Sequence, residues 1–197
     1  MTVYPDARQA LAARRGPPAA LLGMAILIAS EATLFAALIG TYFYLRFETA
    51  VWPPPGVPEP EWLVPTILVA MLALTSIPVQ LAWRSVRGGR VRRARLLLLG
   101  ALVVQAGYFG WAVHDFADQI HRTPITENAY TSIYYTLLGA DHAHVLVGLL
   151  FSVWLLLKLV RGLTVYRANA TQAITWYWHF VNLLTIVVLA TILSARA

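Results

Sequence analysis

Long apolar stretches, separated by short polar segments, run along almost the whole chain. A helix needs about 20 predominantly apolar residues to cross the hydrocarbon core of a bilayer. Five stretches meet this length: residues 19–44, 63–83, 96–114, 132–157 and 174–194. We therefore predict an all-α fold, an integral membrane bundle of five transmembrane helices that forms a single membrane domain over residues 1–197. The first stretch is too long for the core of a signal peptide, so we expect it to be retained as a helix.

Composition supports a membrane protein and excludes several classes of chemistry. Hydrophobic residues make up 59% of the chain and charged residues only 12%, whereas a soluble domain carries about 25% charged residues. The chain has no cysteine, which excludes disulfides, thiolate zinc sites, iron–sulfur clusters and thiol catalysis. A net charge of +6 could suggest nucleic acid, but in a membrane protein the charge of each loop is more informative, and we expect no nucleic-acid partner.

The basic residues predict how the bundle is oriented. Cytoplasmic loops of membrane proteins carry an excess of Lys and Arg. Most of the basic residues fall in the N-terminal segment and in the second and fourth connections, whereas the outer segments hold only Arg46, Arg122 and Arg196. We therefore expect a cytoplasmic N-terminus and a C-terminus outside. The N-terminal segment and the two inner connections contain these basic residues: Arg8, Arg14, Arg15, Arg84, Arg87, Arg90, Arg92, Arg93, Arg95, Lys158, Arg161 and Arg167.

The first outer loop, residues 52–60, contains five prolines. Proline fixes its backbone in an extended conformation. We expect this loop to form a stiff cap over the ends of the helices.

Ionisable side chains occur at three places inside the predicted spans. Each charged group costs about 2.5 to 3.5 kcal/mol near the middle of a membrane unless it is paired or neutralised. Glu31 lies in the first span, Asp141 and His144 in the fourth, and His179 with Asn182 in the fifth. We predict that these five residues form a buried polar cluster where the helices meet.

Each of these groups has a structural and a functional interpretation. Glu31 could make an interhelix hydrogen bond to a histidine, or have a proton-active or lipid-gating role; it projects away from a stripe of small residues that would let another helix approach closely. Asp141 and His144 are three residues apart and are expected to form a hydrogen-bonded pair, either structural or part of a functional site. His179 and Asn182 have the same spacing and predict a polar contact between helices.

A haem or metal site inside this chain is not favoured by the spacing. With a rise of about 1.5 Å per residue, His144 and His179 lie at different depths, whereas two axial haem ligands should be nearly level. The ligand types are suitable for a metal, but they are not clustered as His-x-x-x-His or Glu-x-x-His.

Three sequence blocks carry a resemblance to a known family. Residues 30–35 read Ser-Glu-Ala-Thr-Leu-Phe, residues 139–148 read Gly-Ala-Asp-His-Ala-His-Val-Leu-Val-Gly, and residues 176–182 read Trp-Tyr-Trp-His-Phe-Val-Asn. In this order they resemble the haem-copper oxidase subunit III family, in the short five-helix bacterial form. Two positions depart from the family pattern: Asp141 stands where a histidine is usual, and Asn182 stands where an aspartate is usual.

The resemblance implies an accessory role. It implies a non-catalytic subunit, with no catalytic centre and no cofactor of its own, in a proton-pumping cytochrome c oxidase of a bacterial plasma membrane. The implied partners are subunit I as the main contact, which holds haem and copper, then subunit II and the other oxidase subunits. A supercomplex with a cytochrome c donor or a quinol-oxidising complex is a further implied partner. The resemblance also implies bound phospholipid, an oxygen path into subunit I and support of sustained proton uptake.

The inner-end arginines Arg84, Arg161 and Arg167 are candidates for lipid phosphates, or they act only as topological anchors. Three other functions stay open: subunit III of a quinol oxidase or a nitric oxide reductase accessory protein of the same family, a stand-alone enzyme or electron carrier, and a small proton channel centred on Glu31 and His144.

Overall fold

The computed structural model describes residues 18–196 as a bundle of long helices with no strand among the residues described. Five helical segments are long and apolar enough to cross a membrane, which confirms the predicted all-α membrane fold. Arg8, Arg14 and Arg15, which contribute to the predicted orientation, lie outside the described residues. The helices are α2 (Ala19–Glu48), α3 (Leu63–Leu74), α4 (Ser76–Arg87), α5 (Val91–Arg122), α6 (Ala129–Val160) and α7 (Val165–Leu193), followed by the short 3₁₀ helix η1 (Ser194–Arg196).

The second predicted span is broken into α3 and α4 at Thr75. Proline at position i removes a helical hydrogen bond and clashes with the carbonyl of residue i−4, so Pro78 disturbs the turn around Leu74. The Thr75 hydroxyl donates a hydrogen bond of 2.6 Å to the Leu72 carbonyl in the preceding turn. The break therefore leaves buried polar groups in the middle of the bundle.

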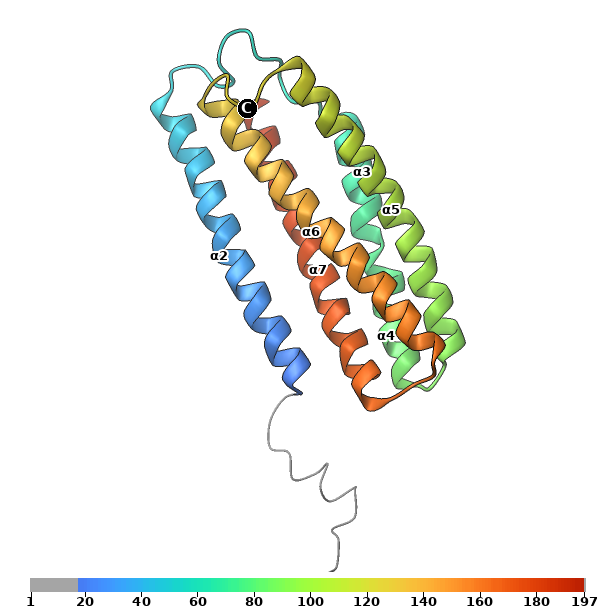
Figure 1. Ribbon diagram of the computed structural model, residues 1–197. Helices are drawn as coiled ribbons and strands as arrows, with labels where there is room; N and C mark the ends of the chain where they lie inside the picture. The colour runs from blue at the N-terminus through green and yellow to red at the C-terminus, as the bar shows by residue number, and fades with distance from the viewer. Residues whose placement is uncertain (1–17, 197) are drawn as a thin grey trace, which may run out of the picture.

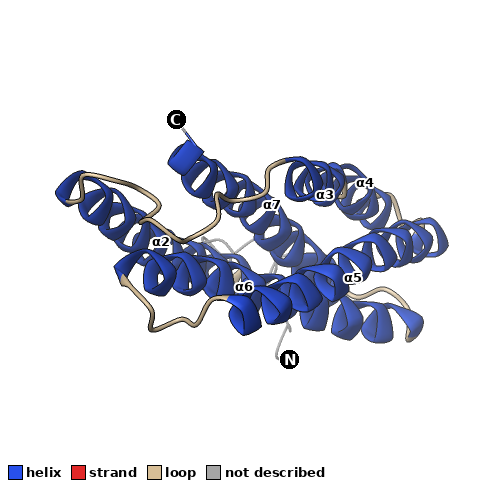
Figure 2. Ribbon diagram, turned by 90° about the horizontal axis from the view of Figure 1, so that it is seen from above, coloured by secondary structure: helices blue, strands red, loops and turns tan. Residues whose placement is uncertain are grey.

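Helix α7 is the centre of the bundle. It contacts α2, α3, α4 and α6, while α5 contacts α3, α4 and α6. Seen from above, α7 lies between α2 and the α3–α4 segment, and α6 and α5 lie along the other side (Figure 2). In the most apolar 18-residue stretch of α7, half of the residues are buried, whereas in the corresponding stretch of α2 only 6% are buried. Among the long helices of the described chain, α2 packs against α6 and α7, at one edge of the bundle (Figure 1).

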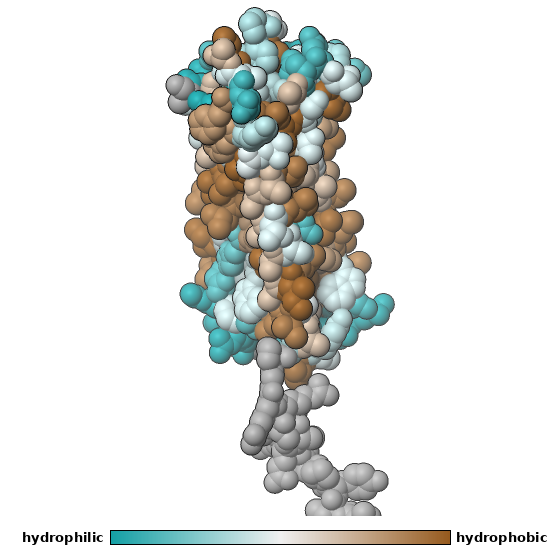
Figure 3. Space-filling model, turned by 90° about the vertical axis from the view of Figure 1, so that its left-hand side faces the viewer, coloured by the Kyte–Doolittle hydropathy of each residue, from teal (hydrophilic) through white to brown (hydrophobic). Residues whose placement is uncertain are grey.

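The two ends of the bundle differ in their connections. We call the end that carries residues 49–62, residues 123–128 and η1 the proline end, and the end that carries residues 88–90 and 161–164 the arginine end (Figure 1). A broad band of hydrophobic side chains lies between more hydrophilic ends (Figure 3). This distribution is that of a protein whose middle lies in hydrocarbon.

Both ends are held by specific hydrogen bonds. At the proline end, Arg196 donates to the Pro60 carbonyl at 2.8 Å, and Pro60 is buried. Asn128 and Thr131 form a reciprocal capping box that starts α6. At the arginine end, Gly162 adopts a left-handed conformation with φ 95° after α6. Such a residue ends a helix at little cost because glycine has no Cβ.

Candidate functional site

His144 lies at the junction of α2, α6 and α7. Its Nε2 lies 3.0 Å from Glu31 Oε2 on α2, and its Nδ1 lies 2.7 Å from the carbonyl of Ala140 one turn earlier on α6. The Phe35 ring stands edge-on to the imidazole, with the ring centroids 5.2 Å apart. Glu31 and Phe35 are four residues apart and share one face of α2. His144 therefore contacts two side chains, Glu31 and Phe35, on the same face of α2.

The hydrogen bonds of His144 fix how many protons it shares with Glu31. A carbonyl can only accept a hydrogen bond, so Nδ1 of His144 must carry a proton. The contact between Nε2 and Oε2 then needs one further proton, which lies either on the carboxyl of Glu31 or on the imidazole. The pair has no net charge in both cases. Such a pair avoids much of the cost of an isolated charge in hydrocarbon.

Helix α7 supports this junction from the other side. The Tyr177 hydroxyl donates a hydrogen bond of 3.0 Å to the main-chain carbonyl of His144. One turn further along α6, Gly148 lets the indole of Trp178 approach the backbone closely, and Trp178 Nε1 donates to Ser152 Oγ at 2.8 Å. The position of His144 is thus fixed by packing of α6 on α7 as well as by Glu31.

Asp141 does not form the expected hydrogen bond to His144, and that prediction is corrected. Oδ1 of Asp141 accepts a bond of 2.9 Å from the Thr185 hydroxyl on α7, while the imidazole of His144 reaches Glu31 on α2. Positions i and i+3 of a helix diverge by about 60° around the axis. In α6 this angle is enough to direct the two side chains to different neighbouring helices.

His179 and Asn182 both contact the segment around the break between α3 and α4. His179 Nε2 lies 2.9 Å from Gln80 Oε1, and Asn182 Nδ2 donates to Ser76 Oγ at 2.8 Å. Gln105 of α5 reaches the same place and donates to Thr75 Oγ1 at 3.0 Å. The break at Thr75 thus provides hydroxyl groups that accept from the amide nitrogens of Gln105 and Asn182, while the amide oxygens of both side chains stay buried without a partner among the described residues.

The five predicted polar residues are therefore divided among three contacts of α6 and α7. Glu31 and His144 form one contact, Asp141 and Thr185 a second, and His179 and Asn182 a third that faces α4. Sequence reasoning missed the neutral partners, because it considered only ionisable groups as costly. These partners could have been recognised in the sequence as amide and hydroxyl side chains that lie inside apolar spans. The missed partners are Thr75, Ser76, Gln80, Gln105 and Thr185.

No residue among 18–196 covers the small-residue stripe of α2. The stripe lies on the face away from Glu31, and all of its members are exposed in the structure. Small residues allow close approach of another helix in a membrane. This face is therefore free for contact with another membrane component. The stripe consists of Ala25, Ala29, Ala32, Ala36 and Gly40.

The three candidate lipid ligands lie at the arginine end with different partners. Arg84 and Arg161 have exposed side chains. Arg167 Nη1 donates to the carbonyls of Arg161 and Gly162, at 2.8 and 2.7 Å, and so caps the end of α6. Arg84 and Arg161 keep their guanidinium groups accessible to a phosphate.

No group of three or more His, Cys, Asp or Glu side chains could hold a metal ion within residues 18–196. His144 and His179 have different partners on opposite sides of α7. The arrangement binds helices together and holds a shared proton.

Comparison with known proteins gives consistent matches along the chain. The family profile described as "Cytochrome c oxidase subunit III" matches residues 13–194. Cytochrome c oxidase subunit 3 of Bacillus sp. (strain PS3) is 29% identical over 177 residues, which cover 87% of this chain and 83% of that protein. A probable cytochrome c oxidase subunit 3 of Nocardia farcinica is 30% identical, covering 89% and 87%. Quinol oxidase subunit 3 of Bacillus subtilis is 27% identical, covering 84% and 82%.

Proposed function

The chain belongs to the cytochrome c oxidase subunit III family, and on that premise we propose that it is the non-catalytic subunit III of a bacterial aerobic terminal oxidase. The observation that carries the proposal is the match over residues 13–194, which includes all three polar contacts of α6 and α7. The chain is a multi-pass membrane protein and part of an oxidase complex. We place it in the bacterial plasma membrane, with the arginine end in the cytoplasm.

The exposed surfaces of α2 support the proposed packing against the catalytic subunit. Only 6% of the residues in the most apolar stretch of α2 are buried by the other described residues. Glu31 on the same helix contacts His144 on the face toward the bundle. A helix with one face fixed and a small-residue face exposed is suited to contact with another transmembrane helix. In the proposed complex, subunit I covers this surface and holds the haem and copper, and subunit II and other subunits complete the assembly.

Lipid binding is the second part of the proposal. Arg84 and Arg161 are exposed at the arginine end and can pair with phospholipid phosphates, because guanidinium binds phosphate through two parallel hydrogen bonds. The Glu31–His144 pair, which has no net charge, provides a stable junction beside the lipid-exposed surface of α2. In the complex, bound lipid and this junction support oxygen access to subunit I and sustained proton uptake during proton pumping.

The electron donor separates two candidate functions. Relatives of similar identity are named as subunits of cytochrome c oxidase and of quinol oxidase. We propose the cytochrome c oxidase and keep the quinol oxidase as the alternative. Oxidation of reduced cytochrome c by the purified complex would support the first, and oxidation of a quinol without cytochrome c would support the second.

Affinity purification of the chain with its complex tests the accessory role. With a tag on this chain, mild detergent should recover larger subunits and a visible haem spectrum. Stripping those subunits from the tagged chain should remove the spectrum completely. A Soret band that stays with the isolated chain would contradict the proposal and favour an enzyme or electron carrier. Proton flux in liposomes containing only this chain, abolished by Glu31→Gln, would instead favour a channel.

A further inference from the structure

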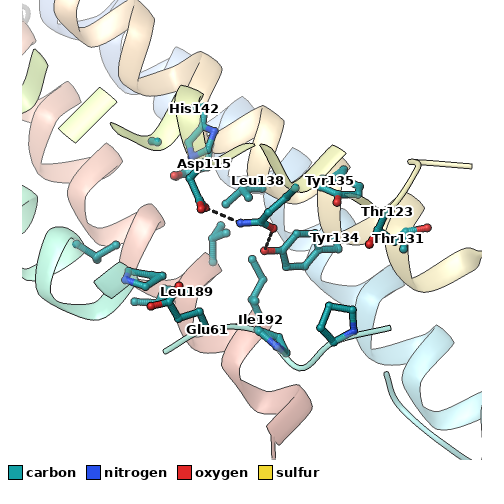
Figure 4. A pocket seen from close by; sticks show the side chains of 18 of the residues that line it. Glu61, Asp115, Thr123, Thr131, Tyr134, Tyr135, Leu138, His142, Leu189 and Ile192 are labelled. Atoms are coloured by element: carbon teal, nitrogen blue, oxygen red, sulfur yellow. Dashed lines mark hydrogen bonds between the residues drawn. The ribbon is translucent and has the colours of Figure 1, made fainter. Parts of the chain in front are cut away.

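A cavity of about 250 Å³ lies at the proline end between α3, α5, α6 and α7. The proline-rich loop forms part of its wall through Val57 and Pro60, and Leu189 and Ile192 of α7 line its side (Figure 4). Asp141 and His142 of α6 also line it. Of the three polar contacts described above, the one between Asp141 and Thr185 lies in the wall of this cavity.

The Asp141 carboxyl has one oxygen without a partner. Oδ1 accepts from Thr185, but Oδ2 is fully buried and has no hydrogen-bond partner in the described residues, and Asp141 is only 1% exposed. An unsatisfied buried acceptor costs about 1 to 3 kcal/mol. Since both Asp141 and Thr185 line the cavity, water in the cavity can supply the missing donor.

Asp141 is too deep to be reached by surface water along the outside of the bundle. It lies twelve residues after Ala129, the first residue of α6, which corresponds to a depth of about 18 Å along the helix. The cavity provides a path of polar groups over part of this depth. Asp115 accepts a hydrogen bond from Gln119, and Gln119 in turn accepts one of 2.7 Å from the Tyr134 hydroxyl (Figure 4).

The charges along the cavity are predominantly negative. Glu59, Glu61 and Asp115 line it together with Asp141, and Figure 4 shows Glu61 and Asp115. Arg122 also lines it, and its guanidinium lies 4.0 Å from the Asp118 carboxylate, so the lining acids outnumber this cation. A cleft lined by one sign of charge and bounded by apolar walls concentrates the opposite ion. The cavity should therefore attract cations and repel anions.

We propose that this cavity is a water-filled, cation-selective site through which Asp141 exchanges protons with the aqueous phase at the proline end. A hydronium ion in the cavity transfers one proton to Oδ2, leaving a water molecule and a neutral carboxyl, and release is the reverse step. Thr185 continues to donate to Oδ1 in both states. The titratable groups around Asp141 are Tyr108 and Asp115 of α5, His142 and His144 of α6, Tyr177 of α7 and Glu61 before α3.

The absence of native cysteine makes the test direct. Leu189→Cys places one thiol in the half-buried wall of the cavity, in native membrane vesicles, while both Asp141 and Thr185 are kept. Two membrane-impermeant methanethiosulfonates of opposite charge, one with trimethylammonium and one with sulfonate, are compared by mass spectrometry of this chain. Each rate is divided by the rate with a free thiol in solution. We expect the cationic reagent to react about tenfold faster or more, and Asp141→Asn to reduce this ratio.

Matched variants separate the cavity from general exposure. Val57→Cys in the proline-rich loop should react from the same side of the vesicle. Leu183→Cys on the exposed face of α7 should stay unmodified in lipid. Leu138→Trp should fill the cavity and slow the reaction at position 189. Ala112→Cys, also in the cavity wall, replaces the reporter if Leu189→Cys does not assemble.

Equal normalised rates for the two reagents would overturn the proposal. So would a reporter that stays unmodified while Val57→Cys reacts. The inference concerns the cavity of this chain alone, so its failure leaves the accessory role untouched, and loss of co-purifying subunits would not affect the labelling result.

Discussion

Gly148→Ala tests whether the helix junction beside His144 has the packing described. A Cβ at this position would lie 2.8, 3.0 and 3.1 Å from three ring atoms of Trp178, and the shortest of these distances is below those that real Cβ contacts show. The indole is fully buried and held by its hydrogen bond to Ser152, so it cannot move away freely. Overpacking of this kind costs about 1 to 3 kcal/mol.

A matched glycine in α5 gives the opposite expectation. Gly107 is also inside a helix, but no atom lies within 4 Å of its added Cβ. Replacing a helical glycine by alanine in free space stabilises by about 0.5 to 1 kcal/mol, because the unfolded chain has less backbone freedom to lose. Gly148→Ala should therefore lower the free energy of unfolding while Gly107→Ala raises it. SDS titration of the purified chain in mixed micelles measures both.

A double substitution identifies the indole as the cause. In the Trp178→Phe background the smaller ring leaves room for the methyl group, so the cost of Gly148→Ala should fall. If Gly148→Ala changed stability no more than Gly107→Ala, or cost the same with and without the indole, the described contact between α6 and α7 would be refuted.

Two further substitutions test the polar contacts. Glu31→Lys should greatly reduce the yield of intact complex, because it places an uncompensated positive charge where the contact with His144 now has no net charge, whereas Glu31→Gln should assemble; normal yield of the lysine variant on native gels would contradict this placement. Arg167→Ala should destabilise the chain by about 1 kcal/mol, because the cap on α6 is lost. Arg161→Ala should change stability by no more than about 0.5 kcal/mol but reduce the amount of bound anionic phospholipid. Equal melting curves for the two variants would show that the Arg167 cap does not stabilise the chain.

The helical architecture could be predicted from the sequence, because few backbone structures other than a helix can cross the hydrocarbon core of a bilayer. An apolar stretch in a bilayer must satisfy its own backbone, so the five spans could be predicted from hydropathy alone. Hydropathy marks only the apolar part of a helix, however. Helix α5 therefore continues to Arg122 and α6 to Val160, beyond the predicted spans. The break at Thr75 was missed although Pro78, its cause, is visible in the sequence.

The site could be predicted only in part. The cost of burying Glu31 required a partner, and a histidine was the expected one. The side chain directions of Asp141 and His144 could not be derived, because spacing alone does not decide which neighbouring helix each one faces. The cavity was also missed, since it is formed by segments far apart in the sequence, from Val57 in a loop to Ile192 in α7.

Native mass spectrometry of the complex purified through a tag on this chain tests the central claim most directly. We expect one copy of this chain bound to a larger subunit that carries haem and copper, with phospholipid retained on the assembly. A spectrum that contains this chain only as a free monomer or homo-oligomer, under conditions in which the oxidase stays intact, would contradict the account.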